Sequence, residues 1–258
     1  MDYGSFWQIR AKNYNSLQWA NHPLYLKEFI KMGKFKKSDI VLDIGTGTGI
    51  VAHAIAPLVK QVIGLDKSQD MLEHSNWYGN MYFIKRNILS PIFNEGVFDK
   101  VTIRQVFHHI LRGTQRAMNE AYRVLKPGGM IVFSEGIPPS PAVKQDYIEI
   151  FRLKEKRLTF MEEDLVALME RAGFKDIQLK IVWLRKVSVQ NWLTNSGLPQ
   201  AIQDEIFKLH VYANDYFKKA YNMVETEGDC LIDMKMAILT GKKYSFSSGE
   251  PPKFERKT

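Results

Sequence analysis

The sequence predicts an α/β protein built on a doubly wound sheet of seven strands, mostly parallel, with a helical insertion before an antiparallel last strand. Two observations support this fold class. Short apolar runs alternate with helix-like segments through the central half of the chain, a pattern typical of parallel strands covered by helices on both faces. The first apolar run also leads into a turn with three glycines, at 45–49.

The first five strands are short apolar runs separated by polar or turn-forming residues. We expect them at 39–44, 61–66, 81–86, 99–104 and 130–135. Helix-like segments lie between them at 50–59, 68–77 and 114–125. Strands that alternate with helices of this length form crossover units, in which the strands run parallel.

A further helix is expected at 160–172, where apolar residues recur at helical spacing. Thr159, with Glu162 three residues later, resembles a capping box at its start. Gly173 is a typical residue for its end.

The sixth and seventh strands are expected at 176–184 and 231–241. If the seventh strand runs antiparallel beside the sixth, their connection emerges at the carboxyl ends of the parallel strands. Ligands of doubly wound sheets bind at these ends. The connection, 186–230, is therefore expected to form a lid over the site.

We expect one domain, at 1–243, in which the lid is an insertion, followed by a disordered polar tail at 244–258. The lid is rich in aromatic residues. A stripe such as Phe207, Tyr212 and Tyr216 is more typical of a core than of a ligand pocket.

Composition excludes several classes of protein. With Cys230 as its one cysteine, the 258-residue chain cannot form a disulfide framework, and we expect no metal site. The sequence shows neither a signal-peptide pattern nor an apolar run of the roughly 18–20 residues that a membrane span requires. We therefore expect a cytoplasmic protein.

The net charge of +8 arises from scattered basic residues, with local concentrations at 32–37, at 152–157 and in the tail. A basic balance can indicate a nucleic-acid surface. Because the excess is scattered, we interpret these segments as solvated faces and a basic tail, and nucleic acid is not the expected partner.

The spacing of the glycine turn discriminates between ligand classes. A phosphate-binding loop requires Lys-Ser or Lys-Thr after its last glycine, and a dinucleotide fingerprint requires G-x-G-x-x-G. Here Asp43, Gly45, Gly47 and Gly49 follow the pattern D-x-G-x-G-x-G, which resembles motif I of the class I methyltransferases that use S-adenosylmethionine (SAM). The glycines would let the backbone approach the cofactor, and Asp43 would order the turn.

This resemblance extends along the chain and implies roles for further residues. Asp66, at the end of the second strand, would accept hydrogen bonds from both ribose hydroxyl groups. Lys67 and Met71 would flank the adenine ring. Asn87 stands where the family often has aspartate and would accept a hydrogen bond from the adenine amino group, while Ile88 would pack on the ring.

The segment RVLKPGG, at 123–129, resembles the turn before the fifth strand in ubiquinone-biosynthesis and natural-product methyltransferases. The resemblance covers roughly residues 10–185 and implies a Rossmann-like fold. It also implies that Tyr14 reaches the carboxylate of SAM, and that Gln105 and the backbone of Arg104 meet its methionine end.

His108 and Glu135 are the candidate catalytic residues. Some sugar O-methyltransferases of the superfamily carry a His-His pair after strand four and an acid that closes strand five, and this sequence resembles that arrangement. A base is required if the acceptor must lose a proton, and histidine has a suitable pKa. The alternative is that the pair only caps a helix or packs.

The expected acceptor is a small organic molecule, methylated on oxygen or carbon in the biosynthesis of a secondary metabolite, sugar or quinone. The sequence lacks the [DN]-P-P-[YFW] motif of base-amine methyltransferases and the double-glutamate loop of protein arginine methyltransferases. An RNA or protein methyltransferase and a non-catalytic SAM-binding protein remain alternatives, and a homodimer is left open.

Overall fold

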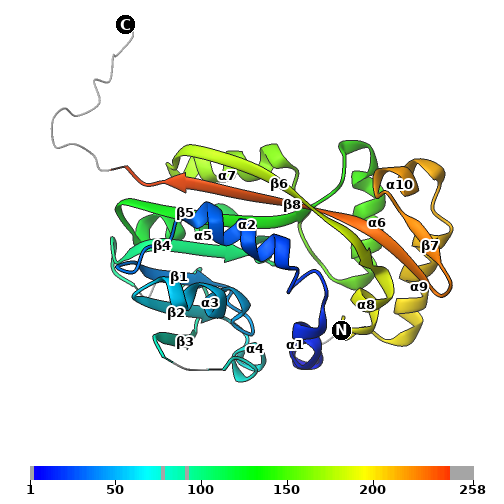
Figure 1. The fold of residues 1–258 in the computed structure, drawn as a ribbon, viewed down its shortest axis with the longest axis horizontal. Helices are drawn as coiled ribbons and strands as arrows, with labels where there is room; N and C mark the ends of the chain where they lie inside the picture. Colours follow the sequence, from blue (N-terminus) through cyan, green and yellow to red (C-terminus); the bar gives the residue numbers. More distant parts are fainter. Residues whose placement is uncertain (1–2, 77–78, 91–92, 245–258) are drawn as a thin grey trace, which may run out of the picture.

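The computed structural model describes residues 3–76, 79–90 and 93–244 and contains one eight-stranded mixed sheet (Figure 1). The strands, in chain order, are β1 (Ile40–Ile44), β2 (Gln61–Asp66), β3 (Met81–Lys85), β4 (Phe98–Arg104), β5 (Leu125–Ile137), β6 (Lys175–Ser188), β7 (Val224–Thr226) and β8 (Asp229–Lys242). The order across the sheet is β3-β2-β1-β4-β5-β8-β6, with β7 paired to β8.

The sheet confirms the predicted topology. Strands β1 to β5 pair in parallel, and β8 runs antiparallel between β5 and β6. The difference from the predicted seven strands is β7, a three-residue strand that forms a hairpin with β8. Its three residues are exposed, so it lacks the apolar pattern that would have predicted it.

The helices are α1 (Tyr3–Asn13), α2 (Pro23–Gly33), α3 (Ile50–Ile55), α4 (Gln69–Glu73), α5 (Thr114–Val124), α6 (Lys144–Lys154), α7 (Glu162–Ala172), α8 (Val189–Thr194), α9 (Gln200–Val211) and α10 (Asp215–Ala220). Short 3-10 turns occupy Tyr14–Ser16, Ala56–Leu58, Phe107–His109 and Pro141–Val143. Helix α3 is shorter than predicted because the chain tightens into the 3-10 turn that contains Pro57, whose ring cannot continue a helical hydrogen-bond ladder.

The predicted capping box of the helix at 160–172 is wrong. Helix α7 begins at Glu162, and its N-cap residue is Met161. The carboxylate of Asp164 accepts a hydrogen bond from the Met161 N–H at 2.8 Å. The sequence pattern therefore located the helix and its end at Gly173, whose φ is 101°, but misplaced the start by two residues.

Helices cover both faces of the sheet and produce two apolar cores. One core contains Val41 of β1 together with buried residues of α2 and α3. The other contains the next residue, Leu42, together with buried residues of α5 and α7. Successive side chains of a strand point to opposite faces, so β1 supplies both cores.

The predicted insertion lies at one end of the sheet, beside α6, where β6 and β8 extend beyond the other strands (Figure 1). It contains α8, α9, α10 and β7. The expectation that Phe207, Tyr212 and Tyr216 form a core stripe is wrong for two of them, because Tyr212 is 82% exposed and Tyr216 57% exposed. Phe217 and Tyr221 are the aromatic residues of α10 and its C-cap that are buried.

Among the described helices, none is long and apolar enough to span a bilayer. The predicted disordered tail at 244–258 lies outside the described residues except for Tyr244. The helix predicted at 68–77 is shorter than expected, because α4 ends at Glu73, and residue 77 lies outside the described residues.

Candidate active site

The glycine turn joins β1 to α3 through three left-handed residues. Gly45, Gly47 and Gly49 have φ values of 67°, 57° and 84°, a region that L-residues enter only with strain. A Cβ on Gly45 would lie 2.3 Å from Cγ2 of Val106. Gly45 is therefore required both by its backbone conformation and by the close packing of Val106 against the turn.

Asp43 orders this turn from the buried end of β1. Its carboxylate accepts hydrogen bonds from the hydroxyl groups of Thr46 and Thr102, both at 2.7 Å. Burial raises the pKa of Asp43 to about 6, although these two hydroxyl groups act in the opposite direction. These contacts link the end of β1 to the turn through Thr46 and to β4 through Thr102.

The raised pKa of Asp43 predicts a specific pH dependence of stability. A carboxyl group whose pKa is higher in the folded state stabilises the fold below its unfolded pKa and loses this contribution as pH rises toward about 6. The free energy of unfolding of the wild type, relative to Asp43→Asn, should therefore fall by roughly 3 kcal/mol between pH 4 and pH 7. Urea unfolding at several pH values measures this difference, and a constant difference would contradict the prediction.

Asp66 closes the turn from the end of β2. Its two carboxylate oxygens accept hydrogen bonds from the N–H groups of Gly47 at 2.9 Å and Ser68 at 2.8 Å. An ionised carboxylate has about four lone-pair positions, so Asp66 retains acceptor capacity toward a ligand in the cavity that it lines.

The residues expected around the adenine ring lie together. Lys67, Met71, Asn87 and Ile88 all line the cavity that contains the glycine turn. Met71 is buried and Ile88 half-buried. The amide oxygen of Asn87 accepts a hydrogen bond from the N–H of Leu89 at 3.0 Å, so it already has one local donor.

Arg104 and Gln105 are held mainly by contacts within the protein. The Arg104 guanidinium donates a hydrogen bond to the carbonyl oxygen of Ala20 at 2.7 Å. The side-chain amide of Gln105 donates to the Tyr25 hydroxyl group at 2.9 Å and accepts from the N–H of Gly136 at 3.1 Å. Both residues line the cavity, and the backbone of Gln105 is left-handed, with φ 60°.

Tyr14 also lines the cavity, from the 3-10 turn after α1. Its ring lies edge-on to Trp19, with centroids 5.9 Å apart. Desolvation by burial raises the pKa of Tyr14, so its hydroxyl group keeps its proton at neutral pH and can donate a hydrogen bond.

His108 and Glu135 form a buried hydrogen-bonded pair. Nδ1 of His108 lies 2.7 Å from Oε2 of Glu135. The second carboxylate oxygen of Glu135 accepts hydrogen bonds from the N–H groups of Val106 at 3.0 Å and Phe107 at 2.7 Å. Glu135 is thereby fixed by the 3-10 turn at the end of β4, and Nε2 of His108 is the ring nitrogen left for a ligand.

The electrostatics of the pair favour a neutral imidazole. Desolvation, followed by the charge of Arg157, holds the pKa of His108 well below 6.5. Burial raises the pKa of Glu135 to about 7, opposed first by Arg157 and then by the backbone N–H groups. A neutral His108 whose Nδ1 proton points to Glu135 presents Nε2 as a proton acceptor.

One cavity of about 260 Å³ joins these two groups of residues, many times the space that a single water requires. Its lining includes Gly45, Gly47 and Asp66 of the predicted cofactor site and also His108. The cavity lies at the carboxyl ends of the parallel strands, where ligands of doubly wound sheets bind.

Comparison with known proteins identifies the kind of domain. Residues 42–133 match a family model described as a methyltransferase domain. Demethylmenaquinone methyltransferase of Staphylococcus carnosus is 29% identical over 198 residues, which cover 64% of this chain and 80% of that protein. YcgJ of Bacillus subtilis, described as a methyltransferase, is 25% identical over 197 residues, covering 72% of this chain and 76% of that protein.

The solved structure of YcgJ has a TM-score of 0.74 to this chain, with 23% identity over 87% of this chain and 100% of that chain. Residues 42–133 form a methyltransferase domain. The predicted methyltransferase class and the Rossmann-like fold are thereby confirmed. The predicted donor, SAM, is the compound bound in a structural neighbour, phosphoethanolamine N-methyltransferase 2 of Haemonchus contortus, with a TM-score of 0.62 and 17% identity over 89% of this chain and 56% of that chain.

The cavity of the methyltransferase is also lined by residues that the sequence did not single out as site residues. They are Trp7, Arg10, Tyr147, Phe151, Lys154 and Arg157, whereas His109 and Trp192 belong to the predicted His-His pair and the predicted lid. They come from α1 and from α6 and the loop after it, which are far apart in the sequence. Four of them lie in the segment 136–160 after the fifth strand, which the sequence does favour as a place for substrate specificity, and two belong to its basic run at 152–157.

The interpretation of 152–157 as a solvated face is wrong for three of its residues. The side chains of Lys154, Glu155 and Arg157 are 2%, 4% and 7% exposed. Alternate residues of the run, Arg152 and Lys156, do face solvent. The segment therefore carries buried charges into the cavity of the methyltransferase.

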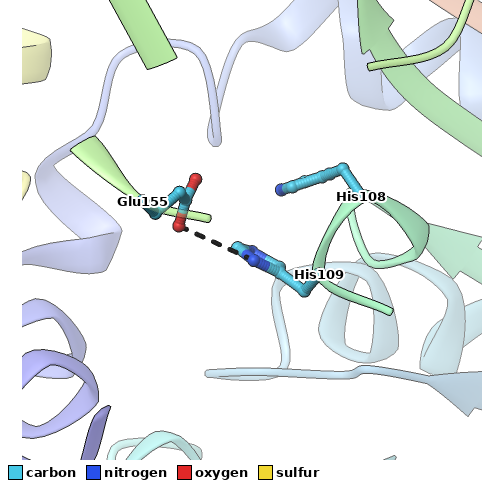
Figure 2. A group of neighbouring side chains, drawn as sticks. All are labelled: His108, His109 and Glu155. Atoms are coloured by element: carbon cyan, nitrogen blue, oxygen red, sulfur yellow. Dashed lines mark ion pairs between the residues drawn. The ribbon is translucent and has the colours of Figure 1, made fainter. Parts of the chain in front are cut away.

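His108, His109 and Glu155 have metal-ligating atoms that all lie within 4.8 Å of one another, and Figure 2 shows both rings directed toward the carboxylate. No metal site was predicted. Glu155 is already paired with Lys154 and lies near Arg157. An incoming divalent cation would be repelled by these charges, so the geometry does not favour a metal here.

Proposed function

We propose that the methyltransferase transfers the methyl group of SAM to a hydroxyl group or an acidic carbon of a small organic acceptor. The observation that carries this proposal is one cavity lined both by the glycine turn and by His108, whose Nδ1 is hydrogen-bonded to the buried Glu135 behind it. The acceptor atom attacks the methyl carbon, the carbon–sulfur bond breaks, and S-adenosylhomocysteine leaves. Nε2 of His108 receives the acceptor's proton.

Glu135 is a positioning residue in this proposal. It holds the Nδ1 proton of His108, so that Nε2 faces the acceptor as a base, and it stabilises the imidazolium that forms. Holding donor and acceptor in line in a dry cavity supplies much of the remaining rate.

We propose the cofactor contacts in the same way. Asp66 accepts from the ribose hydroxyl groups, and Asn87 accepts from the adenine amino group through the lone pair that Leu89 leaves available. Lys67, Met71 and Ile88 surround the adenine. The glycine turn, Tyr14, Gln105 and the backbone of Arg104 meet the methionine end of SAM.

The insertion at 186–230 is proposed to cover the acceptor within a single domain at 1–243. Trp192 of α8 supports this proposal, because it is buried and lines the cavity. It packs against Phe151 of α6, with centroids 5.3 Å apart. An aromatic wall of this kind suits a planar or ring-containing acceptor.

The Staphylococcus carnosus relative is named for demethylmenaquinone, so a quinone is one class of acceptor to test. The test has two measurements on the full chain. Calorimetric titration with SAM should show binding at one site. Incubation with methyl-labelled SAM should label members of a panel of phenols, sugars and demethylmenaquinone, and leave RNA and proteins unlabelled.

SAM binding without label transfer to any member of the panel would favour a non-catalytic SAM-binding protein. Label transfer to RNA, with activity that falls steeply as salt rises, would favour an RNA methyltransferase, because phosphate contacts release counterions.

A further inference from the structure

We infer that the acceptor carries an anionic group, a carboxylate or a phosphate, which Lys154 and Arg157 bind beside His108. This inference rests on the proposed function, since it names the class of acceptor for the same cavity. It stands on four features of the described residues: buried cations on the cavity wall, aromatic rings that hold them, an excess of positive charge, and their place next to the base.

Both cations are part of the cavity wall. Lys154 is the last residue of α6, and Arg157 lies three residues later, in the loop before α7. Both line the cavity, although their side chains are almost completely shielded from solvent. Buried charges are costly unless they are paired or perform a function.

Aromatic rings hold the two cations in place. The guanidinium carbon of Arg157 lies 4.2 Å from the centroid of Phe151 and 5.6 Å from that of Tyr147. Nζ of Lys154 lies 5.6 Å from the Phe151 centroid. A ring orients a cation without neutralising it, so the charge remains available to an anion.

Positive charge exceeds negative charge at this end of the cavity. Arg10, Lys154 and Arg157 all surround the carboxylate of Glu155, with Arg10 and Arg157 at 3.7 and 3.8 Å. Glu135, the carboxylate on the other side of His108, is occupied by His108 and two backbone N–H groups. Bound SAM adds a further positive charge on its sulfonium.

The pKa values are consistent with this excess. Burial, followed by the charge of Arg10, lowers the pKa of Lys154 to about 7. Burial alone would raise the pKa of Glu155, but Lys154 and the neighbouring cations hold it well below its ordinary range. An anionic ligand would restore the charge balance and keep Lys154 protonated.

The two cations lie close to the proposed base. The N–H of Leu158, next to Arg157, donates a hydrogen bond to the carbonyl oxygen of His108 at 2.9 Å. The rings of His108 and His109 are 4.0 Å apart, and Nδ1 of His109 lies 3.6 Å from Glu155 (Figure 2). An anion held by Lys154 and Arg157 would therefore orient the rest of a small acceptor toward His108.

A binding experiment tests the anion site without requiring turnover. The full chain, saturated with S-adenosylhomocysteine, is titrated with inorganic phosphate and, separately, with benzoate, while the fluorescence of its tryptophans is followed. At least one anion should saturate, and which one does so distinguishes phosphate from carboxylate. Arg157→Gln and Lys154→Gln should each weaken that binding about 10–100-fold.

Arg152→Gln is the matched control, because Arg152 lies on α6, as Lys154 does, with its side chain 72% exposed. The anion affinity of this variant should equal that of the wild type. Thermal unfolding shows whether each variant folds. If Arg157→Gln does not fold, the anion affinity of Lys154→Gln is compared with that of the wild type. Failure of both anions to bind the wild type would overturn the inference.

A second experiment uses matched acceptors, such as 3,4-dihydroxybenzoate and its methyl ester. The charged acceptor should have the lower KM in the wild type, and Arg157→Gln should remove this difference in KM. Addition of EDTA, which removes divalent metal ions, should leave the difference unchanged. If neutral acceptors are methylated and neither anion binds, the inference is overturned and the proposed function stands. If an anion binds the wild type but not Lys154→Gln or Arg157→Gln, and no acceptor is methylated, the anion site is supported and the proposed function is contradicted.

Discussion

His108→Ala is expected to lower kcat about 10²–10⁴-fold, the usual contribution of a general base, while the affinity for SAM stays near that of the wild type. The structural reason is that His108 lines the cavity with Nδ1 fixed by Glu135 at 2.7 Å. Single-turnover methylation with labelled SAM measures the chemical step, and calorimetry measures SAM binding. A fully active variant would show that the pair only packs.

Glu135→Gln separates positioning from packing. An amide that still accepts from Val106 and Phe107 directs its NH₂ group to Nδ1 of His108 and shifts the ring proton to Nε2, the wrong side for a base. We expect a lower kcat and an altered pH profile, with KM little changed. His74→Ala is the control, because His74 is exposed and outside the cavity lining, and its activity should be normal.

Gly45→Ala is expected to have the second large effect, on both stability and SAM binding. An L-residue at φ 67° costs roughly 1–2 kcal/mol, and the overlap with Val106 adds about 1–3 kcal/mol. For a domain of this size each kcal/mol lowers Tm by roughly 2–4 °C. We therefore expect Tm to fall by roughly 5–15 °C and SAM affinity to fall at least about tenfold as the turn shifts.

Gly96→Ala is a close control for backbone strain. Gly96 has a φ of 69°, but a Cβ there would meet no atom within 4 Å. Its substitution should show only the smaller strain cost and normal SAM affinity. If Gly45→Ala and Gly96→Ala lose the same stability, the packing of Val106 against the turn contributes nothing.

Short-range patterns predicted the sheet well. The apolar runs located the seven longer strands. Central strands such as β1 are apolar because they are buried between two helical layers, whereas the edge strands β3 and β6 are only partly apolar and partly buried. The strand β7 and the helices α1, α2 and α6 were missed. Helix α1 has almost no apolar face, and β7 is wholly exposed, so neither carries a periodic signal.

The residues that the sequence predicts to bind the cofactor lie close together, since they follow successive strands of one repeating βα arrangement, and most of them line one cavity. Asp43 lies near the end of β1, Gly45 follows β1 directly and Asp66 ends β2, and the parallel pairing of β1 with β2 brings these strand ends together. The contact between Asp66 and the N–H of Gly47 follows directly from that arrangement.

By itself, the sequence determined the fold class, the methyl donor and the candidate pair of His108 and Glu135. Only the tertiary structure decided which charges of 152–157 are buried, and that they meet α1 and α8 at the same cavity. The physical reason is that burial of a charged side chain depends on partners distant in the chain. In the sequence, Lys154 and Arg157 resemble solvated residues. In the structure, Phe151, Tyr147 and Glu155 surround them.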